Sequence, residues 1–198
     1  NARKDPNCIF PINQLNFLES KGYVKSVANE ILSCMGGIYS QRRVLSELAP
    51  AVLSEFRRQK VDIALLVPMW PVCHQTVCLI ARYLEENKLP TVCVGSALDI
   101  FQSGKPPRAV FTNYPLGHSA GRPFDVKDQI SIIKSALDLF ESEDKETEPR
   151  ILHNEWGEQT WQVEASSTEG VDTREERDET PQFQEQSDIS AAKATGQL

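Results

Sequence analysis

The segment VDIALLVPM, residues 61–69, constrains the fold more than any other part of the sequence, because it is a short aliphatic run without polar alternation. A strand with one face in water alternates apolar and polar side chains, whereas a strand buried on both faces is apolar throughout. We therefore predict that this segment forms a buried strand of a parallel sheet.

The sequence after this strand alternates helical and strand-like segments. Helical periodicity marks residues 72–88, with an apolar stripe made by Val77, Ile80, Ala81 and Leu84. The further elements expected are a strand at 89–97, a short helix at 97–105, a strand at 108–115 and a closing helix at 125–142 with Asp125 as its N-cap. This order predicts a parallel βαβαβ unit with right-handed crossovers, and hence a three-layer α/β fold of the Rossmann or flavodoxin type.

Two more helices are expected upstream of the first strand. They cover residues 12–22 and 42–60, and Pro50 is expected to interrupt the second. We expect both to cover one face of the sheet.

The balance of positive and negative residues changes near residue 142. Residues 1–140 carry 16 Lys and Arg against 12 Asp and Glu, whereas residues 141–198 carry 5 against 16. The acidic part has too few large apolar side chains to offset its ordering entropy by burial. We predict an α/β domain at 1–142, lacking an N-terminal portion, and a largely disordered tail at 143–198, in which the patch 151–161 has two tryptophans able to dock on the domain.

Composition argues against several functional classes. The net charge is −7 and no basic stripe is interleaved with aromatics, so nucleic-acid binding is not expected. No apolar stretch reaches the roughly 18 to 20 residues that span a bilayer, so no membrane segment is expected. The five cysteines lack framework spacing, which favours reduced thiols in the cytoplasm, and Cys93, within a predicted strand, is expected to be inert.

Ligands of open parallel sheets bind beyond the carboxyl ends of the strands, where loops and helix N-termini meet. Three loops, 69–75, 95–99 and 113–123, are predicted at that edge. The candidate site residues that they and the start of the following helix supply are Cys73, His74, Gln75, Thr76, Ser96, Asn113, Tyr114, His118 and Arg122.

Cys73 is the candidate nucleophile of this site. Pro71 suits the first turn of a helix, where its missing N–H is no loss, and so places Cys73 in that turn. Unpaired backbone N–H groups and the positive end of the helix dipole favour a thiolate there. His74 or His118 is the candidate acid or base, and Arg122 the candidate clamp for a carboxylate.

Simpler interpretations remain open for the same residues. Cys73 can be buried filler, His74 an exposed residue at a helix start, and Arg122 an ion-pair partner of Asp125. A zinc site made of Cys73, His74 and His118 lacks the paired ligand spacing of structural zinc, so no metal is expected.

Three segments resemble the selenoprotein B family of the glycine, sarcosine and betaine reductases. They are DPNCIFPINQLNFLESKG at 5–22, VDIALLVPMWPVCHQTVCLIARYLEENKLPTV at 61–92 and KPPRAVFTNYPLGHSAGRP at 105–123. The resemblance covers about residues 3–140 and is closer to the D-proline reductase branch.

The resemblance implies reductive cleavage of the C–N bond next to the carboxylate of a small amino acid. A pyruvoyl group on a companion subunit holds the amino group, a selenolate attacks the α-carbon, and a thiol resolves the adduct with a dithiol as final reductant. No cofactor is expected in this chain. The expected partners are the amino-acid substrate, a pyruvoyl-containing subunit, a thiol reductant and further copies in an oligomer.

One departure from the family pattern bears on activity. Cys73 stands where the family has selenocysteine, and Trp70 stands where it has the partner cysteine. An internal disulfide within the motif is therefore not possible, and Cys34 or an external thiol would have to resolve an adduct. The alternative is a non-catalytic binding or scaffolding homologue that has lost the redox pair.

Overall fold

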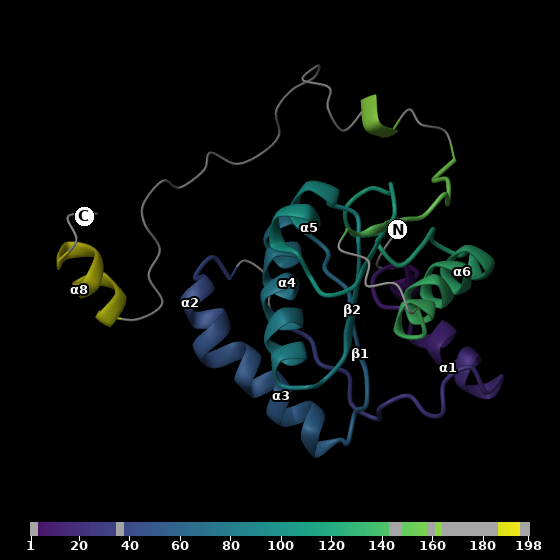
Figure 1. Ribbon diagram of the computed structural model, residues 1–198. Coiled ribbons are helices and arrows are strands. Elements are labelled where there is room, and N and C mark those ends of the chain that lie inside the picture. The colour runs from purple at the N-terminus through teal and green to yellow at the C-terminus, as the bar shows by residue number, and fades with distance from the viewer. Residues whose placement is uncertain (1–3, 35–37, 143–147, 158–160, 164–185, 195–198) are drawn as a thin grey trace. The chain divides into compact units, whose positions relative to one another are not determined.

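The computed structural model describes residues 4–34, 38–142, 148–157, 161–163 and 186–194 (Figure 1). The chain separates into two compact units, Asn1–Ala165 and Ser166–Leu198. Helix α8 (Gln186–Ala194) lies in the second unit. Most of the predicted disordered tail lies outside the described residues.

The first unit is an α/β domain. Its helices are the short η1 (Pro6–Cys8), α1 (Ile12–Ser20), α2 (Gln41–Arg43), η2 (Val44–Leu48), α3 (Ala49–Arg58), α4 (Pro71–Glu86), α5 (Leu98–Gly104), α6 (Val126–Leu137) and η3 (Asp138–Phe140). Its strands are β1 (Ala64–Leu66), β2 (Thr91–Gly95), β3 (Ala109–Phe111) and β4 (Arg150–Ile151). None of these helices is long and apolar enough to cross a membrane, within the described ranges.

The four strands form one parallel sheet in the order β1-β2-β3-β4. The three strands predicted from the sequence are present, but each is shorter than its apolar segment. β1 ends at Leu66, two residues before Pro68, which has no N–H to donate to a neighbouring strand. The predicted buried character is confirmed most clearly in β2, whose five residues are all buried.

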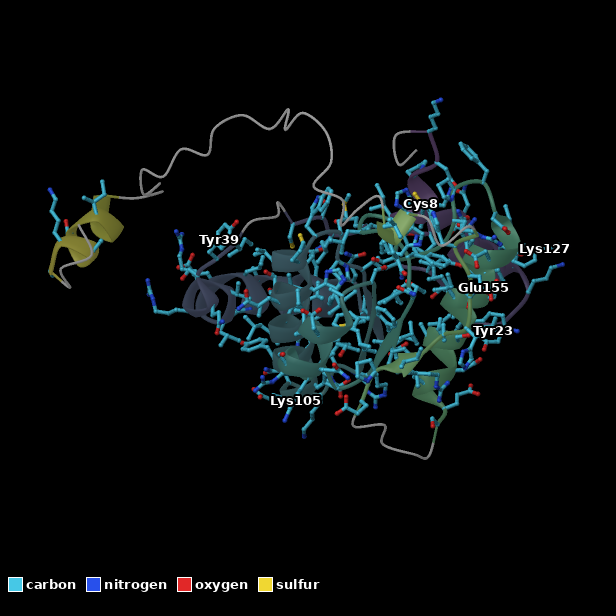
Figure 2. All side chains as sticks on the ribbon, turned by 90° about the horizontal axis from the view of Figure 1, so that it is seen from above. Cys8, Tyr23, Tyr39, Lys105, Lys127 and Glu155 are labelled. Atoms are coloured by element: carbon cyan, nitrogen blue, oxygen red, sulfur yellow. The ribbon has the colours of Figure 1, made fainter. Side chains whose placement is uncertain are left out.

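Helices cover both faces of the sheet, which confirms the three-layer α/β fold. Figure 1 shows α4 and α5 on one side of the strands and α1 and α6 on the other. Val92 and Val94 of β2 pack with residues of α1 and α6, whereas Cys93 packs with α4 and α5. Lys127 of α6 and Lys105 after α5 accordingly lie on opposite sides in Figure 2.

The two crossovers of the predicted βαβαβ unit, through α4 and α5, have the same hand, whereas a third connection, which the sequence did not predict, has the other. The strand order continues in one direction across the sheet, yet α4 and α5 cover one face and α6 the other. The connection from β3 through α6 to β4 therefore has the opposite hand to the two before it. Consequently, the chain leaves β2 and β3 toward opposite faces.

Pro50 does not interrupt the predicted helix. The turn before it, η2, is a π-helical turn in which the Ala49 N–H bonds to the Val44 carbonyl, and it runs directly into α3. A wider turn of this kind accommodates the missing N–H and the bulk of the proline ring.

The α/β unit extends past the predicted boundary at residue 142. Ile151 of β4 is in register with Phe111 of β3, and the Leu152 N–H donates to the Phe111 carbonyl at 2.9 Å. Trp156 docks on the domain, in contact with Tyr114 and His118, as the sequence suggested for this patch. Trp161, the second tryptophan of the patch, is only partly buried.

Candidate functional site

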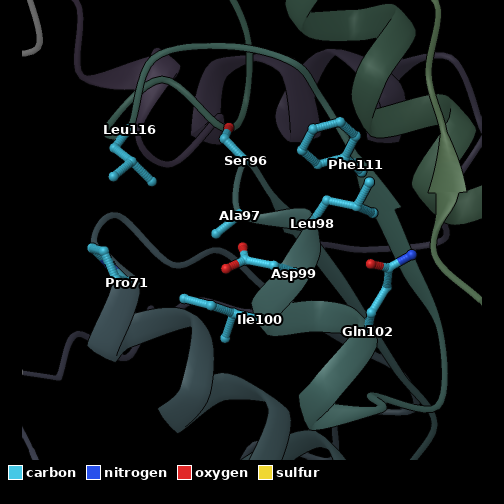
Figure 3. Close-up of a pocket in the computed structure, with 9 residues that line it drawn as sticks. All are labelled: Pro71, Ser96, Ala97, Leu98, Asp99, Ile100, Gln102, Phe111 and Leu116. Carbon is cyan, nitrogen blue, oxygen red and sulfur yellow. The ribbon is translucent and has the colours of Figure 1, made fainter. Parts of the chain in front are cut away.

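An open pocket of about 550 Å³ lies at the carboxyl edge of the sheet. Its walls come from the start of α4, the end of β2 with α5, the end of β3 and the loop after β3. The nine residues that line it are Pro71, Ser96, Ala97, Leu98, Asp99, Ile100, Gln102, Phe111 and Leu116 (Figure 3).

The pocket forms where neighbouring strands send the chain to opposite faces. After β2 the chain continues into α5 on one face, and after β3 it leads to α6 on the other. Two connections that diverge in this way leave a crevice beyond the strand ends, which is the usual ligand site of an open α/β sheet.

Three hydroxyl side chains link the ends of the first three strands beneath this pocket. The Ser96 Oγ lies 3.1 Å from the Thr112 Oγ1 and 3.3 Å from the Ser119 Oγ. The Ser119 hydroxyl donates to the Pro68 carbonyl at 3.1 Å, just beyond β1. Of this cluster, sequence reasoning placed Ser96 at the edge but missed Thr112 and Ser119, because their mutual contact depends on tertiary folding.

His74 is fully buried and joins the start of α4 to the end of β2. Its Nδ1 donates to the Trp70 carbonyl at 2.8 Å, and its Nε2 accepts the Ser96 N–H at 3.0 Å. These two partners fix the neutral tautomer, and burial lowers the pKa of His74, partly offset by the Trp70 carbonyl. Because both nitrogens are occupied by the backbone, neither is directed at Cys73, contrary to the predicted acid–base role.

The close approach of His74 to β2 requires glycine at position 95. A Cβ on Gly95 would lie 2.7 Å from the His74 Nε2 and 2.4 Å from the Phe101 Cζ. The His74 and Phe101 rings are themselves 5.3 Å apart at their centroids. Gly95 therefore allows an imidazole and a phenyl ring to pack against the end of the strand.

Cys73 lies in the first turn of α4, as predicted, and is half-buried. It shares a stripe of the helix with Val77, Ile80 and Leu84, since these positions follow it at intervals of four, seven and eleven residues. Ile80 and Leu84 belong to the core that α4 forms with η2, α3 and Ala64 of β1, so the stripe faces that side of the domain. Cys73 therefore lies at the start of the side of α4 that faces η2 and α3, two residues after Pro71 of the pocket wall.

The other cysteines are unlike Cys73. Cys8, Cys78 and Cys93 are fully buried, and burial raises the pKa of each thiol, that of Cys78 to about 12. Cys93 is thus core, as predicted. Cys34 is exposed.

His118 lies beneath Trp156. The two ring centroids are 4.9 Å apart, and both ring nitrogens of His118 are buried without a hydrogen-bond partner among the described residues. Burial lowers the pKa of His118, partly offset by the nearby backbone of Pro115 and Leu116, which lies outside hydrogen-bond geometry. Of the two predicted histidines, His118 is the one whose ring nitrogens make no hydrogen bond to a described residue.

Arg122 is held by two carboxylates of its own chain. Its Nη2 donates to the Asp125 Oδ2 at 2.7 Å, and its Nε lies 3.7 Å from the Asp128 Oδ2. The predicted alternative, a pair with Asp125, is therefore what the structure contains. The guanidinium is not presented to the pocket as a carboxylate clamp.

Asp5 organises the loop that contains Arg122. Its Oδ2 accepts the Phe124 N–H at 2.7 Å and the Gln129 Nε2 at 2.8 Å, and its Oδ1 accepts two bonds from Asn7. The Gln129 amide also donates to the Arg122 carbonyl at 2.8 Å. Sequence reasoning missed this carboxylate, because its bonds to Phe124 and Gln129 join segments more than a hundred residues apart.

The remaining candidate residues line no part of the pocket. Tyr114 is buried and donates to the Asp128 Oδ1 at 2.8 Å, and burial together with this bond raises its pKa. Asn113 is exposed and accepts from Gln162, while the hydroxyl of buried Thr76 donates to the Val72 carbonyl within α4.

Gln75 is partly buried at the start of α4. Among the described residues, no group of three or more His, Cys, Asp and Glu is arranged to hold a metal ion.

Comparison with characterised proteins relates this arrangement to a reductase. The chain is 29% identical over 136 residues to D-proline reductase subunit gamma of Acetoanaerobium sticklandii. The chain is a distant homologue of that subunit. The aligned region covers 69% of this chain and 56% of the D-proline reductase subunit. No protein-family model and no solved structure matches the chain.

The homologue is, by its name, one subunit of a reductase. The comparison thus supports the resemblance to the D-proline reductase branch and a reductase-type family. It does not identify the reacting groups, for which the geometry of the site is the guide.

Proposed function

We propose that this chain is a subunit of a thiol-dependent reductase related to D-proline reductase, with Cys73 as its nucleophile. The observation that carries the proposal is the position of Cys73: half-buried in the first turn of α4, at the carboxyl edge of the sheet and two residues after Pro71 of the pocket wall. The proposed reaction is reductive cleavage of the C–N bond of an amino acid, with a dithiol as reductant.

Helix geometry gives Cys73 a physical reason to react. The first-turn N–H groups have no partner within the helix and, with the helix dipole, stabilise a negative charge near them. A thiolate is the nucleophilic form of cysteine. The three buried cysteines lack such a location, since burial disfavours their charged forms.

The proposed step balances atoms and electrons. The Cys73 sulfur forms a bond to the α-carbon as the C–N bond breaks, and the electron pair leaves with nitrogen, which takes up a proton. A thiol of the dithiol then attacks the Cys73 sulfur, the α-carbon takes up a proton, and the second thiol releases Cys73. The substrate gains two electrons and the dithiol becomes a disulfide.

Two histidines of this chain have proposed roles in that step. His118, with its unpartnered nitrogens, is the proposed proton donor or acceptor, and His74 would fix the start of α4 through the Trp70 carbonyl. A pyruvoyl group, proposed to lie on a partner subunit, would hold the substrate amine. The proposed external dithiol takes the place of the partner cysteine that Trp70 replaces.

A second candidate function is a non-catalytic binding subunit. Trp70 is 57% exposed at the N-cap of α4, where the resemblance expects a redox-active cysteine. Arg122, the expected carboxylate clamp, is paired with aspartates. Both observations favour a chain that has lost turnover but kept the fold.

Thiol reactivity and turnover together test the proposal. We expect iodoacetamide at neutral pH to alkylate Cys73 about tenfold faster than free cysteine. With a pyruvoyl-containing partner subunit, D-proline and dithiothreitol, reduced product is expected from wild type and from Cys34→Ser, and not from Cys73→Ser. Alkylation of Cys73 at the rate of free cysteine, with no product from any of D-proline, glycine, sarcosine or betaine, would favour the binding subunit.

A further inference from the structure

We infer that the pocket at the carboxyl edge binds a ligand through a cationic nitrogen carried on an apolar body, with Asp99 and Ser96 as the recognising groups. The inference rests on the walls of the pocket and is independent of the proposed chemistry of Cys73.

The walls of the pocket favour a ligand with an apolar body. Six lining side chains are hydrocarbon, from Pro71, Ala97, Leu98, Ile100, Phe111 and Leu116. A volume of about 550 Å³ falls in the range of pockets that hold small organic ligands. Burial of apolar ligand surface against these side chains is therefore the main source of binding free energy.

The only ionisable group of the nine lining residues is a carboxylate. Asp99 makes no side-chain hydrogen bond or ion pair with any described residue, and Figure 3 shows its carboxylate directed into the space between Pro71 and Ile100. No Lys, Arg or His belongs to the lining set. An anionic ligand would meet a negative charge there without a compensating cation.

Ser96 adds a hydrogen-bond acceptor. The Ser119 hydrogen is used on the Pro68 carbonyl, and the Thr112 hydroxyl lies 3.2 Å from the Ser119 carbonyl, to which it donates. The Ser96 hydrogen is then directed to the neighbouring hydroxyls, at 3.1 and 3.3 Å. Its lone pairs can accept from a ligand, so Ser96 and Asp99 favour a donor such as an ammonium ion, and the amide of Gln102, the third polar lining residue, can donate or accept.

Arg122, a cationic side chain that could bind an anion, does not change the preference of the pocket for a cationic ligand. Arg122 is paired with Asp125 and Asp128 and does not line the pocket. Should the proposed reductase function hold, these walls would therefore not supply the group that binds the substrate carboxylate.

The test is equilibrium binding to the full chain with Cys73→Ser, so that thiol chemistry plays no part. Three probes of one shape are titrated: cyclopentylmethylammonium, cyclopentylmethanol and cyclopentylacetate. Amide NMR shifts of Leu98, Ile100 and Leu116 report occupancy. We expect the ammonium probe to bind tightest and the carboxylate probe weakest.

Substitutions assign the effect to Asp99. Asp99→Asn is expected to weaken ammonium binding about fivefold, a size consistent with an exposed charge pair, and to leave the alcohol unchanged. Asp62→Asn, an exposed carboxylate at the opposite end of β1, is the matched control and should have no effect. Ser96→Ala tests the acceptor, with a smaller loss expected for the ammonium probe alone.

Two results would overturn the inference. One is equal affinity of wild type for the ammonium and carboxylate probes; the other is ammonium binding that Asp99→Asn leaves unchanged. Because binding is measured without Cys73, a reductase that fails in turnover and a pocket that fails to prefer cations give separate outcomes.

Discussion

Asp5 shows how much one carboxylate contributes to the local structure of this domain. It accepts four hydrogen bonds, from Asn7, Phe124 and Gln129, and so ties the N-terminal segment to the loop before α6. Burial alone would raise the pKa of Asp5, but the hydrogen bonds from these donors outweigh it and lower the pKa below its usual value. The folded state therefore favours the ionised form.

Replacement of Asp5 by alanine leaves these donors buried without an acceptor. We expect the free energy of unfolding at pH 7 to fall by about 2 kcal/mol, measured by urea denaturation. A lowered carboxyl pKa gives stability that is present above the unfolded pKa and lost as pH falls through the folded pKa, so the difference between wild type and variant should shrink in acid. Asp62→Ala, in an exposed position, should change stability little, and a loss of the same size there would contradict the argument.

At the scale of elements, the segment from β4 to Gly157 acts as a strap over the loop after β3. Trp156 packs edge-on against Tyr114 and His118, at centroid distances of 5.1 and 4.9 Å. The Tyr114 hydroxyl also donates to the Glu155 carbonyl at 3.3 Å. The strap is what buries the His118 ring, because Trp156 covers one side of it.

Trp156→Ala should remove this cover. We expect the pKa of His118, lowered by burial in the wild type, to rise toward its ordinary value, which an NMR titration of the imidazole can measure. Stability is expected to fall by about 2 kcal/mol through lost apolar contact. Trp70→Ala removes an exposed tryptophan of the same size and should change neither quantity; an unchanged His118 titration in Trp156→Ala would show that the strap does not bury the ring.

At the scale of the whole molecule, the buried His74 and the half-buried His118 make stability depend on pH. Burial lowers the pKa of both His74 and His118, so the fold favours their neutral forms. The unfolded chain binds protons first as pH falls, and stability is therefore fully present above the unfolded pKa of about 6.5 and declines below it.

We accordingly expect the urea midpoint to decrease between pH 7.5 and pH 5.5. His118→Asn removes one of the two titrations, so its midpoint should fall less over this interval than that of the wild type. A midpoint independent of pH in the wild type, or an identical decrease in both proteins, would refute the role of these imidazoles.

The sequence by itself determined the elements whose causes are local. The aliphatic run before Pro68 forms β1, Pro71 starts α4 with Cys73 in its first turn, and Asp125 caps α6 by accepting the Asp128 N–H at 3.0 Å. Each of these features depends on residues within a few positions of one another. The local sequence is therefore sufficient to predict it.

Only the tertiary structure decided which of the candidate residues are available. His74 is paired with Ser96 because the end of β2 folds against the start of α4, and Arg122 meets Asp128 because α6 packs beneath its loop. The pocket exists because the chain leaves β2 and β3 on opposite faces. The His74 pairing and the pocket depend on segments that are separate in the chain, and the Arg122 pairing depends on how its loop folds back on α6. Hydrophobic periodicity contains no information about which polar groups will pair once water is excluded.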